Sequence, residues 1–260
     1  MIRPALRAAR RPVRRPALRT ADLRLGERLL AAVAAFGVAA VPAALLLVLI
    51  EANWPPLHRL DAGTAGHLHA LVREHPGALA VLRVLSDVVW DPLTMRLLVA
   101  AVVVLLLRRA WRLALWAAAT ATASGLIGWG VKAAVARARP ALPDPVAHAP
   151  GFSFPSGHAM TAATCCAVLL LVSAPVLGPR VRRAAWAAAL VSVLGVGFTR
   201  VALGVHWVSD VLGGWLLGTA LVAATAWAFR GWRRDTGRDV PAPLAEGLEP
   251  ELAGPAPERG

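Results

Sequence analysis

Charged residues are scarce in this chain, and the shortage is greater for acidic than for basic residues. Only 17% of the 260 residues are charged and 57% are hydrophobic, with 28 Lys and Arg against 15 Asp and Glu. A soluble domain is typically about 25% charged, so this composition excludes an ordinary soluble fold and indicates a membrane protein. The net charge of +13 is also typical of nucleic-acid-binding proteins, but no motif of that class accompanies it. We therefore expect no nucleic-acid partner.

Cysteine is nearly absent and tyrosine is absent. The two cysteines, Cys165 and Cys166, are adjacent within an apolar run. Such a pair offers no disulfide framework, so we expect small core residues without a redox role. Tryptophan is abundant instead, and several tryptophans lie near the ends of apolar runs, which is typical of the aromatic belts at membrane interfaces.

Apolar runs divide the chain into six predicted membrane spans. Most of them approach the roughly 20 residues that a helix needs to cross a bilayer. Their approximate bounds are 29–50, 92–107, 113–131, 159–177, 184–198 and 207–229. We therefore expect an all-α, polytopic membrane protein, with a six-helix bundle over residues 29–231. The flanking residues 1–28 and 232–260, which are rich in Arg, Pro or Glu, are expected to be disordered tails.

Residues 51–90 fit none of these spans. Residues 51–76 are polar and contain several histidines, which predicts a polar connection. His67 and His69 are two residues apart and would face differently on a helix, so we interpret them as interfacial polar residues and not as zinc ligands. Residues 77–90 are apolar but interrupted by Arg83 and Asp87, which favours an interfacial or re-entrant helix.

The positions of the basic residues predict the orientation in the membrane. In a six-span topology, both tails and two short basic turns lie on one side and hold 20 of the 28 Lys and Arg. Basic loops stay cytoplasmic, so both termini are expected in the cytoplasm. Seven basic residues remain on the outer side, and three of them, Lys132, Arg139 and Arg200, belong to the segments described next. An extracytoplasmic site would explain these three exceptions.

The first of three notable segments runs from Lys132 to Pro140. Lys132 and Arg139 are seven residues apart, which is nearly two turns of a helix, and Pro140 biases Arg139 out of the helical region. Charged groups beside a bilayer are costly and often mark a functional site. An Arg fork and a Lys point charge suit phosphate oxygens, although basic residues at a helix end are more often membrane anchors.

The second segment, Pro155–His158, is predicted to open a helix. Ser156 is a suitable N-cap, and Gly157 lets the backbone approach a ligand closely. The free N–H groups and the dipole of a helix N-terminus bind anions, and His158 would lie beside such an anion. An ordinary helix cap has the same residues, so this segment alone decides little.

The third segment, Thr199–Asp210, contains a histidine and a carboxylate. His206 and Asp210 are four residues apart and therefore share a helix face, and Arg200 comes from the end of the preceding span. A carboxylate that accepts from one ring nitrogen fixes the tautomer and leaves the other nitrogen free to attack. A purely structural pair is the alternative. The residues alone do not decide whether His158 or His206 is the nucleophile.

Together the three segments resemble the signature motifs of the type 2 phosphatidic acid phosphatase (PAP2) superfamily, in its membrane lipid phosphatase branch. The resemblance covers about residues 77–229, and Thr199 stands where the family usually has Ser. It implies that His206 is a nucleophile that forms a phosphohistidine, that Asp210 orients it, and that His158 protonates the leaving oxygen. It also implies that the phosphate is held by Lys132, Arg139, Ser156, Gly157 and Arg200.

The resemblance further implies a lipid phosphatase that needs no metal and no other cofactor. Three cations can take the part that Mg²⁺ plays in other phosphoryl transfers. The expected substrate is a membrane lipid phosphate: undecaprenyl diphosphate first, then phosphatidic acid or phosphatidylglycerol phosphate. A lipid phosphotransferase and a non-enzymatic lipid-phosphate carrier remain alternatives, whereas six spans disfavour a soluble vanadate-dependent oxidase. The sequence does not predict the oligomeric state.

Overall fold

The computed structural model describes residues 18–254, and every regular element in that range is a helix. The α-helices are α1 (Leu18–Ala39), α2 (Val41–Glu51), α3 (Pro55–Arg73), α4 (Pro76–Val84), α5 (Pro92–Leu106), α6 (Trp111–Val135), α7 (Gly157–Ser173), α8 (Pro179–Ala202), α9 (Val208–Asp235) and α10 (Pro243–Glu246). The π-helical turn η1 (Leu85–Val89) and two 3₁₀ turns, η2 (Ala174–Val176) and η3 (Pro250–Ala253), complete the order. The predicted all-α class is confirmed.

The helices provide five or six membrane spans within the described residues. Five stretches are long and apolar enough to cross a bilayer: Pro76–Leu106, Trp111–Val135, Gly157–Val176, Pro179–Ala202 and Val208–Asp235. A sixth arises if α1 and α2 form one span from Gly26 to Glu51, which is bent by 46°. Pro42 lies in the first turn of α2, where its missing N–H costs nothing, so the chain can break there. The six predicted spans are therefore matched, with the first one bent.

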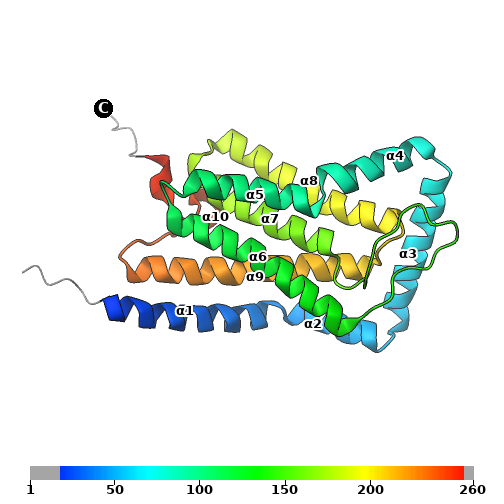
Figure 1. Ribbon diagram of the computed structural model, residues 1–260, viewed down its shortest axis with the longest axis horizontal. Coiled ribbons are helices and arrows are strands. Elements are labelled where there is room, and N and C mark those ends of the chain that lie inside the picture. Colours follow the sequence, from blue (N-terminus) through cyan, green and yellow to red (C-terminus); the bar gives the residue numbers. More distant parts are fainter. Residues whose placement is uncertain (1–17, 255–260) are drawn as a thin grey trace, which may run out of the picture.

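The long helices lie side by side, and α3 crosses one end of the bundle (Figure 1). The loop between α6 and α7 lies at the same end. Both ends of the described chain, at residues 18 and 254, lie at the opposite end of the bundle. Residues 1–17 of the predicted disordered tail lie outside the described residues, and α1 begins at Leu18, inside the segment predicted to be disordered.

Helices α7 and α9 pack closely because α9 presents glycine where they meet. A Cβ atom at Gly214 would lie 2.7 Å from the Ser156 carbonyl oxygen, and one at Gly218 would lie 2.8 Å from that of Met160. No side chain fits in so short a gap. The two glycines therefore serve packing within the bundle, and they bring the starts of α7 and α9 together.

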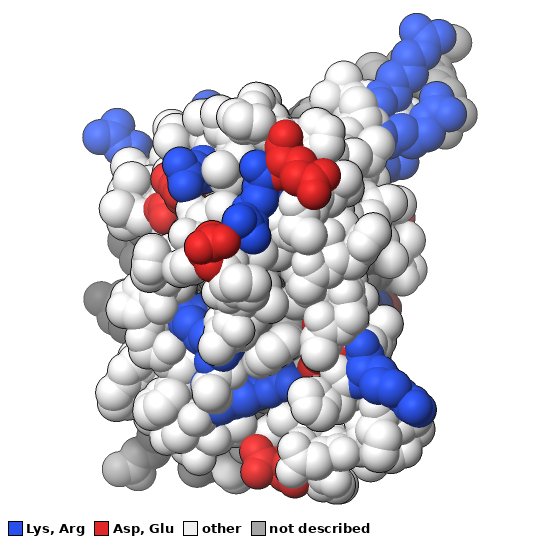
Figure 2. All heavy atoms as spheres, turned by 90° about the vertical axis from the view of Figure 1, so that its right-hand side faces the viewer, with Lys and Arg blue, Asp and Glu red and all other residues white. Residues whose placement is uncertain are grey.

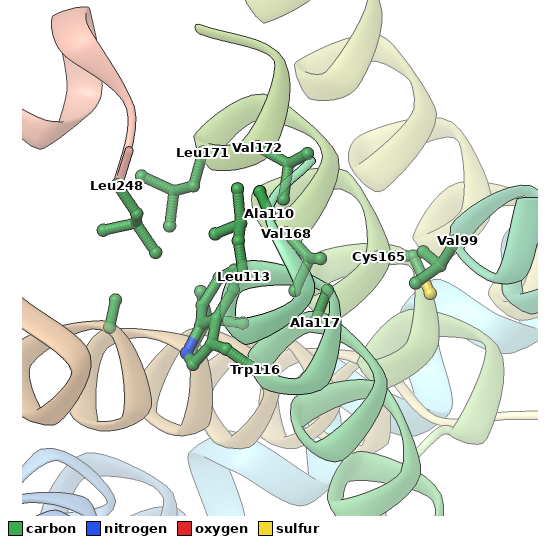
Figure 3. Close-up of a cluster of buried hydrophobic side chains, with 12 residues drawn as sticks. Val99, Ala110, Leu113, Trp116, Ala117, Cys165, Val168, Leu171, Val172 and Leu248 are labelled. Carbon is green, nitrogen blue, oxygen red and sulfur yellow. The ribbon is translucent and has the colours of Figure 1, made fainter. Parts of the chain in front are cut away.

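The C-terminal segment folds back onto the bundle. Leu248 is fully buried and points toward Leu171 and Leu113 in a hydrophobic cluster (Figure 3), and its N–H donates to the Leu171 carbonyl at 3.3 Å. Arg233, also buried, forms an ion pair with Glu251. The expectation that residues 232–260 are disordered is thus wrong as far as residue 254, because apolar burial and a paired arginine anchor a segment whose composition is polar.

Helix α3 replaces the polar connection predicted for residues 51–76. Its buried residues recur at nearly every fourth position, at Leu57, Asp61, Ala65, His69 and Val72. This spacing places them on one face of the helix. His69 is buried and its Nε2 lies 2.9 Å from the Pro143 carbonyl, whereas His67 is exposed. The interpretation of His69 as an interfacial residue is therefore wrong: it ties α3 to the loop between α6 and α7.

Residues 77–90 form α4 and η1 and lead directly into α5. The whole stretch Pro76–Leu106, of 31 residues, is long and apolar enough to cross a membrane. The segment thus belongs to a candidate span, where a separate interfacial or re-entrant helix was expected. The π-helical turn η1 falls at Ser86 and Asp87, whose side chains contact the site described next.

Candidate active site

The predicted histidine–carboxylate pair forms at the start of α9. His206 Nδ1 lies 3.3 Å from Asp210 Oδ2, and both side chains are buried. Asp210 Oδ2 also accepts the backbone N–H of Trp207 at 2.9 Å, so the same oxygen caps the helix. Gly204, with φ of +71°, reverses the chain after α8, and the His206 N–H then bonds to the Arg200 carbonyl at 3.3 Å. Helix and turn therefore fix His206 together.

Arg139 decides the tautomer of His206. Its Nη1 lies 3.1 Å from His206 Nε2. A guanidinium group only donates hydrogen bonds, so Nε2 must be the acceptor and the ring proton must lie on Nδ1, toward Asp210. Burial lowers the pKa of His206 to about 4, although its hydrogen bond to Asp210 acts in the opposite direction. The ring is therefore neutral near pH 7, with a lone pair on Nε2.

Arg139 reaches this position from a loop. Helix α6 ends at Val135, and Ala136 adopts a left-handed conformation with φ of 50°. The chain thus leaves the helix before Arg139, as Pro140 leads one to expect, and Lys132 and Arg139 come from a helix end and a loop. The Arg139 guanidinium also donates to the carbonyl oxygens of Gly151, Pro150, Phe152 and Val205, at 2.7 to 3.1 Å.

Lys132 lies in the last turn of α6, beside the start of α7. Its Nζ donates to the carbonyl oxygens of Phe152 and Ser153, at 2.7 and 3.2 Å. A Cβ atom at Gly157 would lie 3.9 Å from Lys132 Cε, so the lysine stem passes over the first residue of α7. Lys132 and Arg139 thus share the Phe152 carbonyl as an acceptor.

The start of α7 is joined to the start of α9. Ser156 is the N-cap residue, and its Oγ accepts the N–H of Ala159 at 3.5 Å. Its backbone N–H donates to the Asp210 carbonyl at 2.9 Å. His158 follows in the first turn, half-buried, and lies close enough to Arg200 and His206 to interact with their charges. Among the described residues its side chain forms no hydrogen bond.

Arg200 enters from the last turn of α8 and is buried. Its Nη1 donates to Ser86 Oγ at 2.6 Å and lies 3.6 Å from Asp87 Oδ1. Its Nε is buried without a partner among the described residues. A buried donor without a partner is costly, so Arg200 is suited to receive an oxygen of a bound anion.

These contacts bring together the eight residues predicted for the site, from α6, its following loop, α7, α8 and α9. Residues 109–234, which contain them all, match the model of the PAP2 superfamily. Over these residues the chain is similar to the PAP2 superfamily. Its membrane-spanning fold agrees with a solved relative, the transmembrane PAP2 type phosphatidylglycerolphosphate phosphatase from Bacillus subtilis. That structure superposes with a TM-score of 0.64 at 25% identity, over 75% of this chain and 96% of the other.

Three curated PAP2 relatives are similar over shorter segments. Phosphatidylglycerophosphatase B of Bacillus subtilis is 43% identical over 90 residues, which are 34% of this chain and 43% of the relative. Undecaprenyl-diphosphatase of Sulfolobus acidocaldarius is 38% identical over 68 residues, which are 26% of this chain and 29% of the relative. Phosphatidylglycerophosphatase B of Escherichia coli K12 is 42% identical over 77 residues, which are 30% of this chain and 29% of the relative. The matched segments thus span less than half of each relative.

Sequence reasoning missed several residues of this PAP2-like site. Ser86 and Asp87 contact Arg200 from η1, and Asp61 of α3 and Arg137 of the loop contact the start of α9. The signal for Arg137 was available, since it is a cation on the predicted outer side that no motif explained. For Asp61, the only available signal was its spacing of about four residues from the other residues on the buried face of α3.

Basic and acidic side chains are interspersed at this end of the PAP2-like bundle. Figure 2 shows the face of the molecule that carries α3, and the basic side chains appear there in separate groups with acidic ones among them. A continuous basic surface, as a polyanion would require, is not formed on the face drawn.

Proposed function

We propose that this protein is an integral-membrane phosphatase of lipid phosphates or diphosphates that acts through a phosphohistidine on His206. The observation that carries the proposal is the environment of the His206 ring. Nδ1 is held by Asp210, and Nε2 faces Arg139 at 3.1 Å. A neutral imidazole with its lone pair directed at a cation is arranged to meet the phosphorus of an anion held by that cation.

The reaction proceeds in two displacements. His206 Nε2 attacks phosphorus, the bond between phosphorus and the lipid-side oxygen breaks, and His158 gives its proton to that oxygen. Asp210 stabilises the positive charge that forms on the His206 ring. His158 then takes a proton from water, the resulting hydroxide attacks phosphorus, and the bond between phosphorus and Nε2 breaks. Inorganic phosphate leaves, and His206 is neutral again.

Lys132, Arg139 and Arg200 balance the charge on the phosphoryl oxygens during both steps. Arg139 and Lys132 donate to carbonyl oxygens of residues 150–153. A phosphate group offers charged acceptors, which form stronger hydrogen bonds than carbonyl groups do. We therefore expect both side chains to exchange part of these bonds for phosphate oxygens, with Ser156 and the N–H of Gly157 completing the phosphate-binding set.

We further propose that the site faces the outside of the cell membrane and that both termini are cytoplasmic. Two observations support this orientation: the described chain ends lie opposite the site (Figure 1), and most basic residues lie on the side of the ends. Labelling with a membrane-impermeant thiol reagent in intact cells tests it, with Ala141→Cys beside the site and Thr236→Cys near the other end. We expect labelling of Ala141→Cys and not of Thr236→Cys. Labelling of Thr236→Cys alone would show that the orientation is the opposite of the one proposed.

The function is tested by phosphate release from purified protein in detergent. The panel is undecaprenyl diphosphate, phosphatidylglycerol phosphate and phosphatidic acid. The names of the relatives refer to the first two of these lipids. Release from at least one lipid, and none by the His206→Ala protein, is the expected result. Binding without release would instead indicate a carrier, and transfer to an added alcohol without hydrolysis would indicate a phosphotransferase.

A further inference from the structure

A buried carboxylate from α3 contacts the start of α9, 148 residues away in the chain. Asp61 Oδ1 accepts the backbone N–H of Ser209 at 2.9 Å, and Oδ2 accepts the Ser209 hydroxyl at 2.5 Å. The side chain of Asp61 is 1% exposed. A buried carboxylate is costly unless it is well paired, so its position here calls for a role.

Asp61 supplies a further acceptor at the start of α9, in addition to the cap that Asp210 provides. The N-cap position is Trp207, whose backbone is extended and whose side chain is not among the short polar ones that normally cap a helix. The first N–H groups of a helix need acceptors from elsewhere, and α9 receives one from Asp61. The positive end of the helix dipole favours a negative charge at that point.

Arg137 connects Asp61 to the nucleophile pair. Its Nη2 donates to Asp61 Oδ2 at 2.9 Å, and its Nη1 donates to Asp210 Oδ1 at 2.6 Å and to Ser209 Oγ at 2.7 Å. One guanidinium thus binds two carboxylates that are both buried. Because Arg137 occupies Oδ1 of Asp210, the other oxygen, Oδ2, is left to His206.

We propose that Asp61 and Arg137 are positioning residues of the phosphatase reaction, which set the orientation and charge of Asp210 and through it the attacking nitrogen of His206. The inference rests on the proposed function. Neither residue needs to touch the substrate, because both Nη atoms of Arg137 already donate to Asp61, Ser209 or Asp210. The Asp61–Arg137–Asp210 chain links α3, which crosses the end of the bundle, to the catalytic helix α9.

The alternative is that Arg137 binds the phosphate directly. Asp61 and Arg137 line a cavity of about 360 Å³ together with Trp54, His58 and Trp207, and a second anion could enter there. The two roles predict different kinetics. Loss of a substrate ligand raises KM, whereas loss of a residue that positions the nucleophile lowers kcat with KM little changed.

A pH readout separates positioning from a merely structural role. The charged groups that face His206 are Asp210 of α9, Arg139 of the loop, Arg200 of α8, and, in the same site, His158 of α7 and Lys132 of α6. Arg137 acts on His206 only through Asp210. Without Arg137 the negative charge of Asp210 is no longer offset, so the pKa of His206 rises. The acidic limb of the rate profile then moves to higher pH.

The experiment compares Arg137→Gln, Arg137→Lys, Asp61→Asn and the double variant Asp61→Asn/Arg137→Gln with wild type. We expect kcat to fall about 10- to 100-fold, as is typical when a group that orients a reactive ligand is lost, with KM changed less than about threefold. Arg137→Lys should recover part of kcat because it restores the charge. The double variant should lose no more than the worse single variant, since residues that act as one unit are not additive.

The matched control is Arg73→Gln. Arg73 pairs with Asp144 at 2.6 Å on the same end of the bundle, but both side chains are exposed and neither contacts Asp210. It should leave kcat and the pH profile unchanged. Thermal unfolding of each purified variant identifies those that do not fold. If Arg137→Gln alone does not fold, the double variant takes its place, because it removes one charge of each sign.

Three results would overturn the inference while wild type stays active: an unchanged kcat and acidic limb in folded Arg137→Gln, a rise in KM alone, or losses in the double variant that equal the product of the single losses. If wild type itself releases no phosphate from any lipid in the panel, the proposed function fails instead. The two failures are therefore distinguishable.

Discussion

His206 Nε2 and Arg139 Nη1 lie 3.1 Å apart, although the two residues come from different connections of the bundle. The contact places a fixed cation at the atom that is proposed to attack phosphorus. It also requires Nε2 to be the unprotonated nitrogen, so that Nδ1 carries the ring proton and donates a hydrogen bond to Asp210. Anion binding and nucleophile activation are thus two effects of one arrangement.

Replacement of Asp210 by Asn should remove most of the activity. An amide in this position removes the charge that stabilises the His206 ring and can favour the wrong tautomer, which in comparable triads lowers kcat by about 10⁴-fold. The measurement is kcat and KM of Asp210→Asn on the best substrate, with thermal unfolding as a control for folding. Activity within tenfold of wild type would rule out the orienting role.

The rate should fall in acid, because His206 must be neutral to attack phosphorus. The pKa of His206 is lowered to about 4, chiefly by burial, so the nucleophile is neutral above that pH and becomes protonated below it. Activity is therefore lost as the pH falls toward 4. If His206 had an ordinary histidine pKa, the enzyme would lose activity nearer pH 6.5. Profiles of kcat/KM test this, and an acidic limb centred near 6.5 would contradict the buried, neutral His206.

The turn before α9 should be sensitive to a single methyl group. Gly204 has φ of +71°, and a Cβ atom there would lie 3.0 Å from Leu142 Cδ1 and 3.1 Å from His69 Nδ1. Strain of this kind costs about 1–3 kcal/mol, so Gly204→Ala should lower both thermal stability and kcat. The matched control is Gly63→Ala in α3, which meets nothing within 4 Å. Equal stability of the two variants would show that the turn tolerates a side chain.

Chelation should leave the activity unchanged. The proposed phosphate site consists of cationic side chains and N–H groups, which neutralise phosphoryl oxygens without a bridging ion. Phosphate release is measured with and without EDTA after extensive dialysis. A loss of activity that Mg²⁺ restores would show that a metal takes part and would require a different charge balance in the site.

The parts of the site that could be predicted from the sequence are those determined by local spacing. His206 and Asp210 are four residues apart and meet at the start of the helix that the apolar run predicts, with His206 just before its N-cap, and Ser156 caps the helix that follows it. The same reasoning gave the number of spans, because hydropathy is a local property. It did not give the residue at which α6 ends, a left-handed alanine at position 136.

Contacts between distant parts of the chain could not be predicted in this way. Asp61 reaches Ser209 across 148 residues, and a single sequence does not indicate such a pairing. Leu248 gave a similar result at the other end of the bundle, since it lies in a tail of polar composition and is nevertheless fully buried. Both contacts depend on tertiary packing that overrides local composition.

Trapping of the covalent intermediate tests the central claim most directly. A lipid phosphate labelled with ³²P in its terminal phosphoryl group is mixed with the purified protein, and the reaction is stopped with alkali, in which phosphohistidine survives. The account predicts acid-labile label on the peptide that contains His206 in wild type and none in His206→Ala. Label on His206→Ala protein, or full turnover by that variant, would contradict it.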